Sequence, residues 1–141
     1  MAQLLTFKNC YAFHYDRTGR IVYGTAFGGW LTSTCTGALG ADGRLFLGGV
    51  TGSGLPVREA WQANAGGGSD AFVAAFDTDG TLLFSTYLGG QSPEELEALI
   101  PQDDGSVIAT GTSSSKEFLS MFEPSAIGEG SKFLLRLRRK P

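Results

Sequence analysis

Hydrophobic and polar positions alternate in short runs along this chain, and turn residues separate the runs. The first two runs are residues 10–16, with Tyr11, Phe13 and Tyr15 at alternate positions, and residues 21–27. Alternation over about four to eight residues is typical of a half-buried strand, and the Arg17-Thr18-Gly19 junction is typical of a hairpin turn. The pattern therefore predicts two antiparallel strands at the start of the chain.

The same pattern predicts six further strands. They are expected at about residues 34–39, 44–50, 71–77, 81–88, 98–102 and 106–112. Asp-Gly pairs mark several of the turns and favour hairpins. Helical turns are expected near residues 59–62 and at Ser92-Pro93-Glu94-Glu95, where an N-cap serine precedes a proline. The chain therefore looks like a series of meanders joined by a long connection at residues 51–68.

The chain nearly repeats itself. Asp16 to Gly29 aligns with Asp77 to Gly90 at an offset of 61 (77 minus 16), and the turn glycine and the double glycine are kept. Repeats of roughly this length indicate arrays of one structural unit. We expect one domain over residues 1–141, with a first repeat at about 10–68, a second at about 69–130 and an extra strand at 132–138.

The extra strand aligns with the start of the second repeat, again at an offset of 61 (133 minus 72). A single strand at the end of an array presents an unpaired edge. We expect it to be an assembly strand that pairs with the first unit of a neighbouring chain through Phe133, Leu134, Leu135 and Leu137.

Composition agrees with short strands and tight turns. Glycine occurs 21 times and phenylalanine 10 times, while charged residues make up 18%. A net charge of −3 argues against a nucleic-acid surface, which needs a basic face. We expect the one basic cluster, at Arg136, Arg138, Arg139 and Lys140, to be a solubilising tail or a blunted strand edge.

The two cysteines, Cys10 and Cys35, have no metal-ligand spacing. We expect buried free thiols, and the alternative is one disulfide in an exported protein. No run approaches the ~20 apolar residues of a membrane span, so no membrane insertion is expected. Residues 1–8 have no basic-then-apolar leader. The protein therefore stays inside the cell, or a leader has been removed or lies outside this sequence.

The second repeat carries a family resemblance. Residues 69–90 read SDAFVAAFDTDGTLLFSTYLGG, which resembles the bacterial β-propeller repeat known as SBBP (approximately DAFVAKLD, a turn, then LLYSTYLGG). Residues 104–114 and 43–56 are similar to that repeat's later strand and connection. The resemblance covers about residues 10–137. The first copy departs from it at His14-Tyr15 and at Thr25-Ala26-Phe27, and residues 116–130 lack the Phe-Pro pair.

The resemblance implies an all-β fold, with two four-stranded antiparallel β-propeller blades plus one extra C-terminal strand. Propellers close with typically 4 to 8 blades, so two blades imply a ring completed by oligomerisation, as a homotrimer or homotetramer. The alternatives are a fragment of a larger surface protein and a two-sheet sandwich. The resemblance also implies an extracellular or cell-surface location and no catalytic residues.

The residues themselves offer little chemistry. His14 is the only histidine and lies mid-strand without a paired motif, so a hydrolytic triad has no base. Asp77-Thr78-Asp79-Gly80 lacks the later glutamate of a calcium loop, and the glycine runs lack a phosphate-loop pattern. The acid pairs Glu94-Glu95 and Asp103-Asp104 look solvated. We expect no catalytic residue, no metal and no cofactor.

Two tryptophans remain. Trp30 follows the double glycine where the second repeat has Gln91, so the repeat does not require it. Loop packing is its ordinary role, but such an aromatic can also stack on a sugar. Trp61 aligns with Phe122 and is expected to be a structural plug. The sequence thus favours a non-enzymatic binding or scaffolding module, with a lectin-like carbohydrate binder or a protein binder using Trp30 and Gln91 as alternatives.

Overall fold

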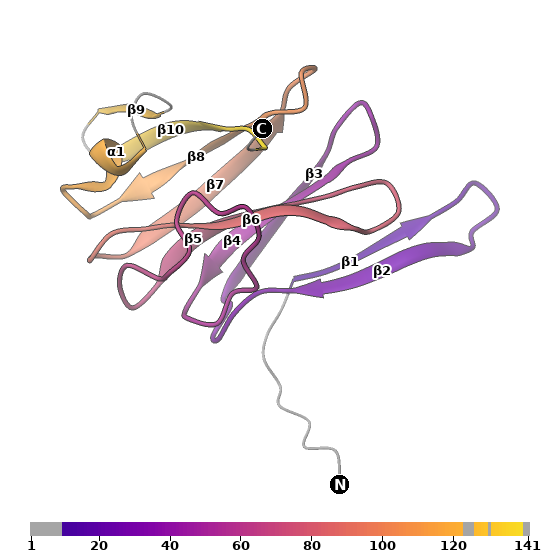
Figure 1. Cartoon of the computed structure of the whole chain (residues 1–141), viewed down its shortest axis with the longest axis horizontal. Coiled ribbons are helices and arrows are strands. Elements are labelled where there is room, and N and C mark those ends of the chain that lie inside the picture. Colours follow the sequence, from indigo (N-terminus) through magenta and orange to yellow (C-terminus); the bar gives the residue numbers. More distant parts are fainter. Residues whose placement is uncertain (1–9, 123–125, 130, 140–141) are drawn as a thin grey trace, which may run out of the picture.

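The structure is a computed structural model that describes residues 10–122, 126–129 and 131–139. Its described part is an all-β molecule with one short helix (Figure 1). The N-terminal hairpin contains β1 (Cys10–Tyr15) and β2 (Ile21–Phe27). The middle sheet has the order β3 (Thr34–Leu39), β4 (Leu45–Thr51), β5 (Asp70–Phe76) and β6 (Leu82–Leu88). The C-terminal sheet has the order β7 (Glu94–Pro101), β8 (Val107–Ser113), β10 (Lys132–Leu137) and β9 (Ala126–Glu129).

The three sheets form a stack with the middle sheet in the centre (Figure 1). Every residue of β5 is buried, because apolar side chains point to both of its faces. One face packs against the C-terminal sheet, with Val73, Phe84, Val107 and Leu135 in the shared core. The opposite face packs against the N-terminal hairpin in a second core, which includes Phe27, Leu47, Phe72, Phe76 and Tyr87. Burial of these side chains is the main stabilising term.

The expectation that each repeat forms its own sheet is wrong. The middle sheet takes β3 and β4 from the first repeat and β5 and β6 from the second, and the C-terminal sheet begins with the last two strands of the second repeat. The cause is the long connection 52–69, which brings β5 alongside β4 in antiparallel register. The described residues therefore form two four-stranded sheets and half of another, and these do not close into a ring.

The predicted extra strand is not an orphan. β10 pairs with β8 along one edge and with β9 along the other, which corrects the expectation that it lacks a partner in its own chain. The side chains of Phe133, Leu135 and Leu137 are buried in the core, and Leu134 is exposed. Ending the chain at Gly130 would therefore remove core residues as well as an edge.

The segment between β8 and β10 holds two elements that the sequence did not predict. Helix α1 (Phe118–Met121) places Phe118 beside Phe133, with ring centroids 4.5 Å apart, and beside Phe122 at 5.1 Å. Strand β9 then covers the outer edge of β10. Phe122 is buried as expected of a plug, whereas Trp61 is exposed, so that prediction holds for only one of the pair.

Other differences are local. Residues 59–62 are not helical, and Glu59 has a positive φ of 47°. Strand β7 begins at Glu94, and no helical turn precedes it. The two cysteines are joined in a disulfide with a Cα–Cα distance of 5.6 Å, which corrects the expectation of free thiols. Within the described ranges, no helix has the length and apolar character needed to cross a membrane. Residues 1–8 and Lys140, discussed above, lie outside those ranges.

Candidate functional site

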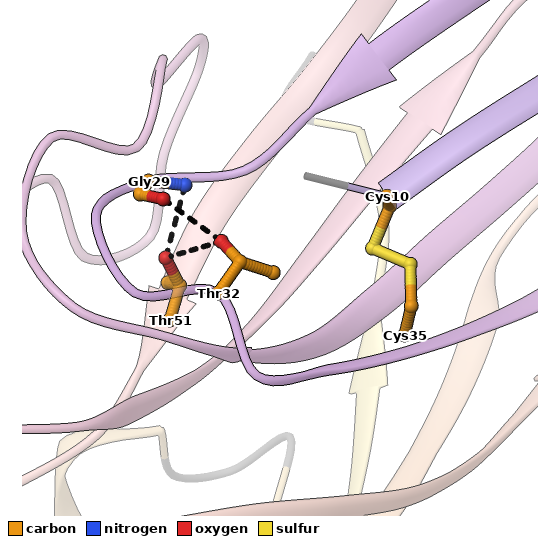
Figure 2. Close-up of a disulfide and its surroundings, with 5 residues drawn as sticks. All are labelled: Cys10, Gly29, Thr32, Cys35 and Thr51. Atoms are coloured by element: carbon orange, nitrogen blue, oxygen red, sulfur yellow. Dashed lines mark hydrogen bonds between the residues drawn. A yellow bond between two sulfur atoms is a disulfide. The ribbon is translucent and has the colours of Figure 1, made fainter. Parts of the chain in front are cut away.

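A buried polar anchor fixes the double-glycine loop after β2 to the end of β4. The Gly29 amide donates to Thr51 Oγ1 at 2.9 Å, and the Thr32 hydroxyl donates to the Gly29 carbonyl at 2.9 Å. The two threonine hydroxyls lie 3.0 Å apart, and the Cys10–Cys35 bridge lies on the adjoining strands (Figure 2). Most buried polar groups in folded proteins are paired in this way, because an unpaired one costs free energy. The loop that carries Trp30 is therefore held rigidly at its base.

The second repeat builds the same anchor with a carboxylate. The Gly90 amide donates to Glu94 Oε2 at 3.0 Å, while the hydroxyls of Ser113 and Ser115 donate to Glu94 Oε1 at 2.8 and 2.5 Å. Glu94 aligns with Thr32, and Ser113 with Thr51, at an offset of 62 (94 minus 32). Glu94 is only 1% exposed. The expectation that this acid is solvated is therefore wrong.

A second buried carboxylate lies beside the first. Asp70 Oδ2 accepts a hydrogen bond from the Gly66 amide at 2.6 Å, whereas Oδ1 is buried and has no hydrogen-bond partner among the described residues. A side chain at Gly89 would overlap the Asp70 carboxyl group, so this close approach requires glycine. Burial raises the pKa of Asp70 and of Glu94, and the negative charge of Asp70 raises the pKa of Glu94 further.

Trp30 and Gln91 both border the connection 52–69, but at different places. Trp30 is 53% exposed, its amide donates to the Ser53 carbonyl at 2.7 Å, and its indole lies against Gly54. The Gln91 amide donates to Glu117 Oε1 at 3.0 Å, and the Gln91 carbonyl lies against Gly67, near the other end of the connection. The structure therefore places the two predicted ligand residues in separate neighbourhoods.

The N-terminal hairpin has an exposed apolar face. Its outer face, which we define as Tyr11, Phe13, Tyr15, Val22 and Ala26, points away from the middle sheet. Tyr11 is 66% exposed, Phe13 57% and Tyr15 55%. Their counterparts in the second repeat, Phe72, Ala74 and Phe76, are buried. The same positions of the repeat are therefore covered in one hairpin and exposed in the other.

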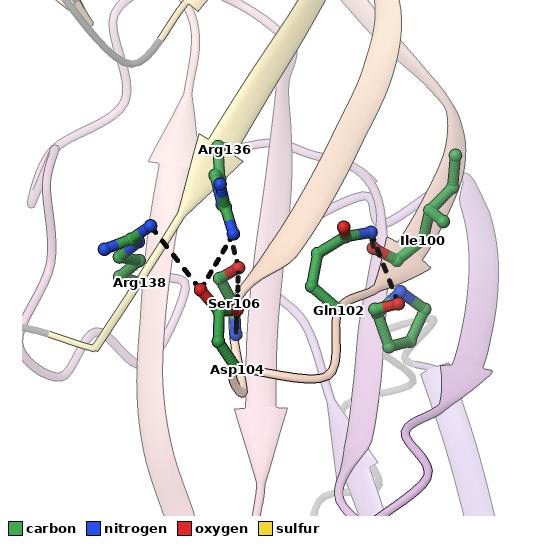
Figure 3. Close-up of polar contacts among 7 residues, drawn as sticks. Ile100, Gln102, Asp104, Ser106, Arg136 and Arg138 are labelled. Carbon is green, nitrogen blue, oxygen red and sulfur yellow. Dashed lines mark hydrogen bonds and ion pairs between the residues drawn. The ribbon is translucent and has the colours of Figure 1, made fainter.

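The opposite end of the stack carries ion pairs beside apolar side chains, since Ile100 is 48% exposed and Leu134 36% exposed. On the outer side of the C-terminal sheet, Lys132 pairs with Glu97 at 3.2 Å. Arg136 and Arg138 pair with Asp104 at 2.8 and 3.5 Å (Figure 3). The Ser106 hydroxyl lowers the pKa of Asp104, and the two arginines lower it further. The basic cluster predicted from the sequence is thus largely paired with carboxylates, since Arg139 also contacts Glu59.

The turn beside these ion pairs is closed by backbone and side-chain bonds. The Gln102 side chain donates to the Ile100 carbonyl at 3.0 Å, and Ser106 Oγ lies 2.5 Å from Asp104 Oδ1 (Figure 3). Arg136 Nε donates to the same serine hydroxyl at 3.0 Å. The charged groups at this end therefore stabilise a hairpin.

Chemistry for a metal or a base is sparse in the described part. Three or more His, Cys, Asp or Glu side chains do not converge there in a way that could hold a metal ion. The His14 ring packs edge-on against Tyr23 with centroids 5.5 Å apart. Comparison with models of known protein families gave no match, and comparison with curated proteins gave none.

Proposed function

We propose that this chain is a non-enzymatic binding or scaffolding module that associates with copies of itself through the outer face of the N-terminal hairpin. The observation that carries the proposal is the contrast between two equivalent strands. Tyr11, Phe13 and Tyr15 on β1 are exposed, whereas the residues at the same positions of β5 are buried between sheets. Covering an apolar face with another apolar surface removes both from water, and this favours association.

The hairpins themselves support this comparison. β1 pairs with β2 in the same register as β5 with β6 in the second repeat, and both pairs have an irregularity one residue before the strand end, at His14/Tyr15 and at Ala75/Phe76. The two hairpins are therefore the same structural unit in different surroundings. The β5–β6 hairpin lies in the middle sheet of the stack, whereas the β1–β2 hairpin lies at one end of it.

The two ends of the stack favour one arrangement of copies over another. In a head-to-tail ring of three or four chains, as expected from the sequence, the outer face would pack on the C-terminal sheet of the next copy. That sheet presents the ion pairs of Lys132 with Glu97 and of Arg136 with Asp104, and removing such pairs from water carries a desolvation cost. Face-to-face pairing of two hairpins avoids this burial, so a symmetric dimer is the arrangement that we favour.

The mass of the protein in solution tests the proposal. Light scattering after size-exclusion chromatography should give a dimer for the native chain at micromolar concentration, and Phe13→Glu should give a monomer. Leu134→Glu, on the opposite end of the stack, is the matched control and should keep the dimer. A trimeric or tetrameric mass would instead favour the ring, and a native monomer would overturn self-association.

A second candidate is a sugar- or peptide-binding surface at Trp30. The observation that favours it is the half-exposed indole on a loop whose base is fixed by Thr32 and Thr51. Rigidly held loops that present an aromatic side chain are common in binding proteins. Screening on a glycan array separates this candidate from a scaffold.

The disulfide supports an exported module. Cys10 lies at the start of β1 and Cys35 in β3, so the bond links the hairpin to the middle sheet. Bonds of this kind persist in oxidising compartments. Together with the resemblance of the repeats to bacterial surface propellers, this favours a place outside the cytosol.

A further inference from the structure

We propose that the edge of β1 that no described strand pairs with accepts an extended peptide strand from another polypeptide, in the position that β4 takes beside β5 and β8 takes beside β10. This inference concerns the edge of the hairpin rather than its outer face, and it does not rest on self-association. Strand addition of this kind uses main-chain hydrogen bonds for affinity and alternate side chains for specificity.

Among the described residues, β1 is paired along one edge only, with β2. Both of its counterparts are paired along both edges, since β5 lies between β4 and β6, and β10 lies between β8 and β9. An unpaired strand edge presents a row of backbone donors and acceptors that can template another strand. Two sheets of the same chain therefore show where a strand would lie beside β1: the position of β4 beside β5, and the position of β8 beside β10.

The register of those sheets specifies what the missing strand should contain. Gly49 of β4 lies opposite Phe72, and Gly111 of β8 lies opposite Phe133. Phe72 and Phe133 are the counterparts of Tyr11. A Cβ at Gly111 would overlap the Glu95 carbonyl of the neighbouring strand and would lie 2.8 Å from the Phe133 ring, so this glycine leaves room for both neighbours. The incoming peptide should therefore have glycine opposite Tyr11.

A groove lies between the N-terminal hairpin and the middle sheet. It has a volume of about 420 Å³, and it is lined by residues 12–15 of β1, by Tyr23 of β2, and by Leu39, Gly43, Leu45 and Thr78. Leu39 is 70% exposed. The groove is lined by no Asp, Glu, Lys or Arg side chain among the described residues, so it suits a peptide whose inward side chains are apolar or carry hydroxyl groups. β4 and β8 have this composition, since they contain only apolar residues, glycine and residues with hydroxyl groups.

A peptide fits this position better than a second copy of the folded chain. In an intact copy β4 and β8 are already enclosed by neighbours on both edges. A copy that paired through its own β1 would also bring its middle sheet, which packs beneath its hairpin, into the space occupied by β3 and β4. The occupant is therefore an extended segment without a sheet beneath it.

Amide hydrogen exchange of the full-length chain tests the proposal, with a synthetic peptide of the sequence of residues 103–113 (DDGSVIATGTS) as the probe. At about 1 mM peptide, exchange in β1 should slow by about tenfold or more. Leu39→Glu in the groove should weaken peptide binding by about tenfold, and Leu134→Glu at the far end should leave it unchanged.

The outcomes decide between strand addition and its competitors. A peptide with valine in place of the residue equivalent to Gly111 should fail to bind, and equal binding would overturn the proposed register. Absence of any slowing in β1, or slowing confined to β8, β9 and β10, would overturn the proposal. Because these readouts are independent of molecular mass, a monomeric native chain that binds the peptide would refute self-association alone.

Discussion

At the scale of single residues, the second double-glycine loop depends on a carboxylate where the first depends on a hydroxyl. Thr32 and Glu94 occupy equivalent places, but only Glu94 carries a titratable group into the interior. The sequence contains the signal for this burial, because Glu94 and Ser113 align with Thr32 and Thr51. The adjacent Glu95 instead favoured a solvent-exposed pair, since adjacent acidic residues usually lie in solvent.

Glu94→Gln should change how stability depends on pH. Burial raises the folded-state pKa of Glu94 above its ordinary value of 4.5. The folded protein therefore retains this proton where the unfolded chain has released it, so the stabilising contribution is complete below pH 4.5 and is lost as the pH rises through the raised pKa. The free energy of unfolding of the variant should decline less above pH 4.5 than that of the native chain. Parallel curves in urea unfolding across pH would contradict this.

Trp30→Ala tests whether the exposed indole binds a ligand or packs the loop. If the surface binds a sugar or a peptide, we expect affinity to fall by about 1 to 3 kcal/mol, the usual loss for a hot-spot aromatic. The melting temperature should change little, because the loop base is held by Thr32 and Thr51. Calorimetric binding and thermal melting of the same variant should be measured together. A lowered melting temperature without loss of binding would assign Trp30 to packing.

At the scale of elements, alternation in the sequence located eight strands, because each strand has one side facing a core. The expected helical turn before β7 did not form, since β8 pairs with β7 from Glu94 onward. Strand β9 and helix α1 could not be predicted from the repeat, because the corresponding connection in the first repeat, residues 52–69, forms neither a helix nor a strand. Their place is decided by the exposed edge of β10 and the aromatic contacts of Phe118.

Because β4 and β8 are equivalent strands, adding a methyl group at the matching glycine of each should lower the stability of the protein. A Cβ at Gly49 would overlap the Thr34 carbonyl, and a Cβ at Gly111 would overlap the Glu95 carbonyl. Gly49→Ala and Gly111→Ala should each destabilise the protein by about 1 to 3 kcal/mol, typical of overpacking. Gly68→Ala is the control, since no atom lies within 4 Å of its added Cβ. Equal urea midpoints for all three variants would show that the strands are not packed as described.

At the scale of the whole molecule, the sequence predicted the all-β class but not the grouping of strands into sheets. Alternation is a local property, whereas the choice of neighbour for β4 depends on how the connection 52–69 returns the chain. The candidate binding surfaces show the same limit. Tyr11, Phe13 and Tyr15 were recognised as strand residues, but their exposure follows from the position of the hairpin at the end of the stack.

The disulfide should contribute much of the stability of that end. It closes a sequence separation of 25 residues, for which the loop-entropy estimate is about 3 kcal/mol. The double variant Cys10→Ala, Cys35→Ala should lose about this amount in urea unfolding. Reductant should lower the free energy of unfolding of the native chain to the value of the variant, and it should leave the free energy of unfolding of the variant unchanged. A native chain that is insensitive to reductant, with two titratable thiols, would contradict the bond.

The mismatch between repeats and sheets bears on how such a protein could grow or shrink during evolution. Each four-stranded sheet is completed by strands from two successive stretches of the chain. Consider a duplication of one full repeat, from Asp16 up to the equivalent Asp77. At the junction, each pair of strands would again meet a pair equivalent to its present neighbour. One complete sheet would be added, and no strand would lose its neighbour. A gene of this kind can change length by whole units wherever the duplication begins.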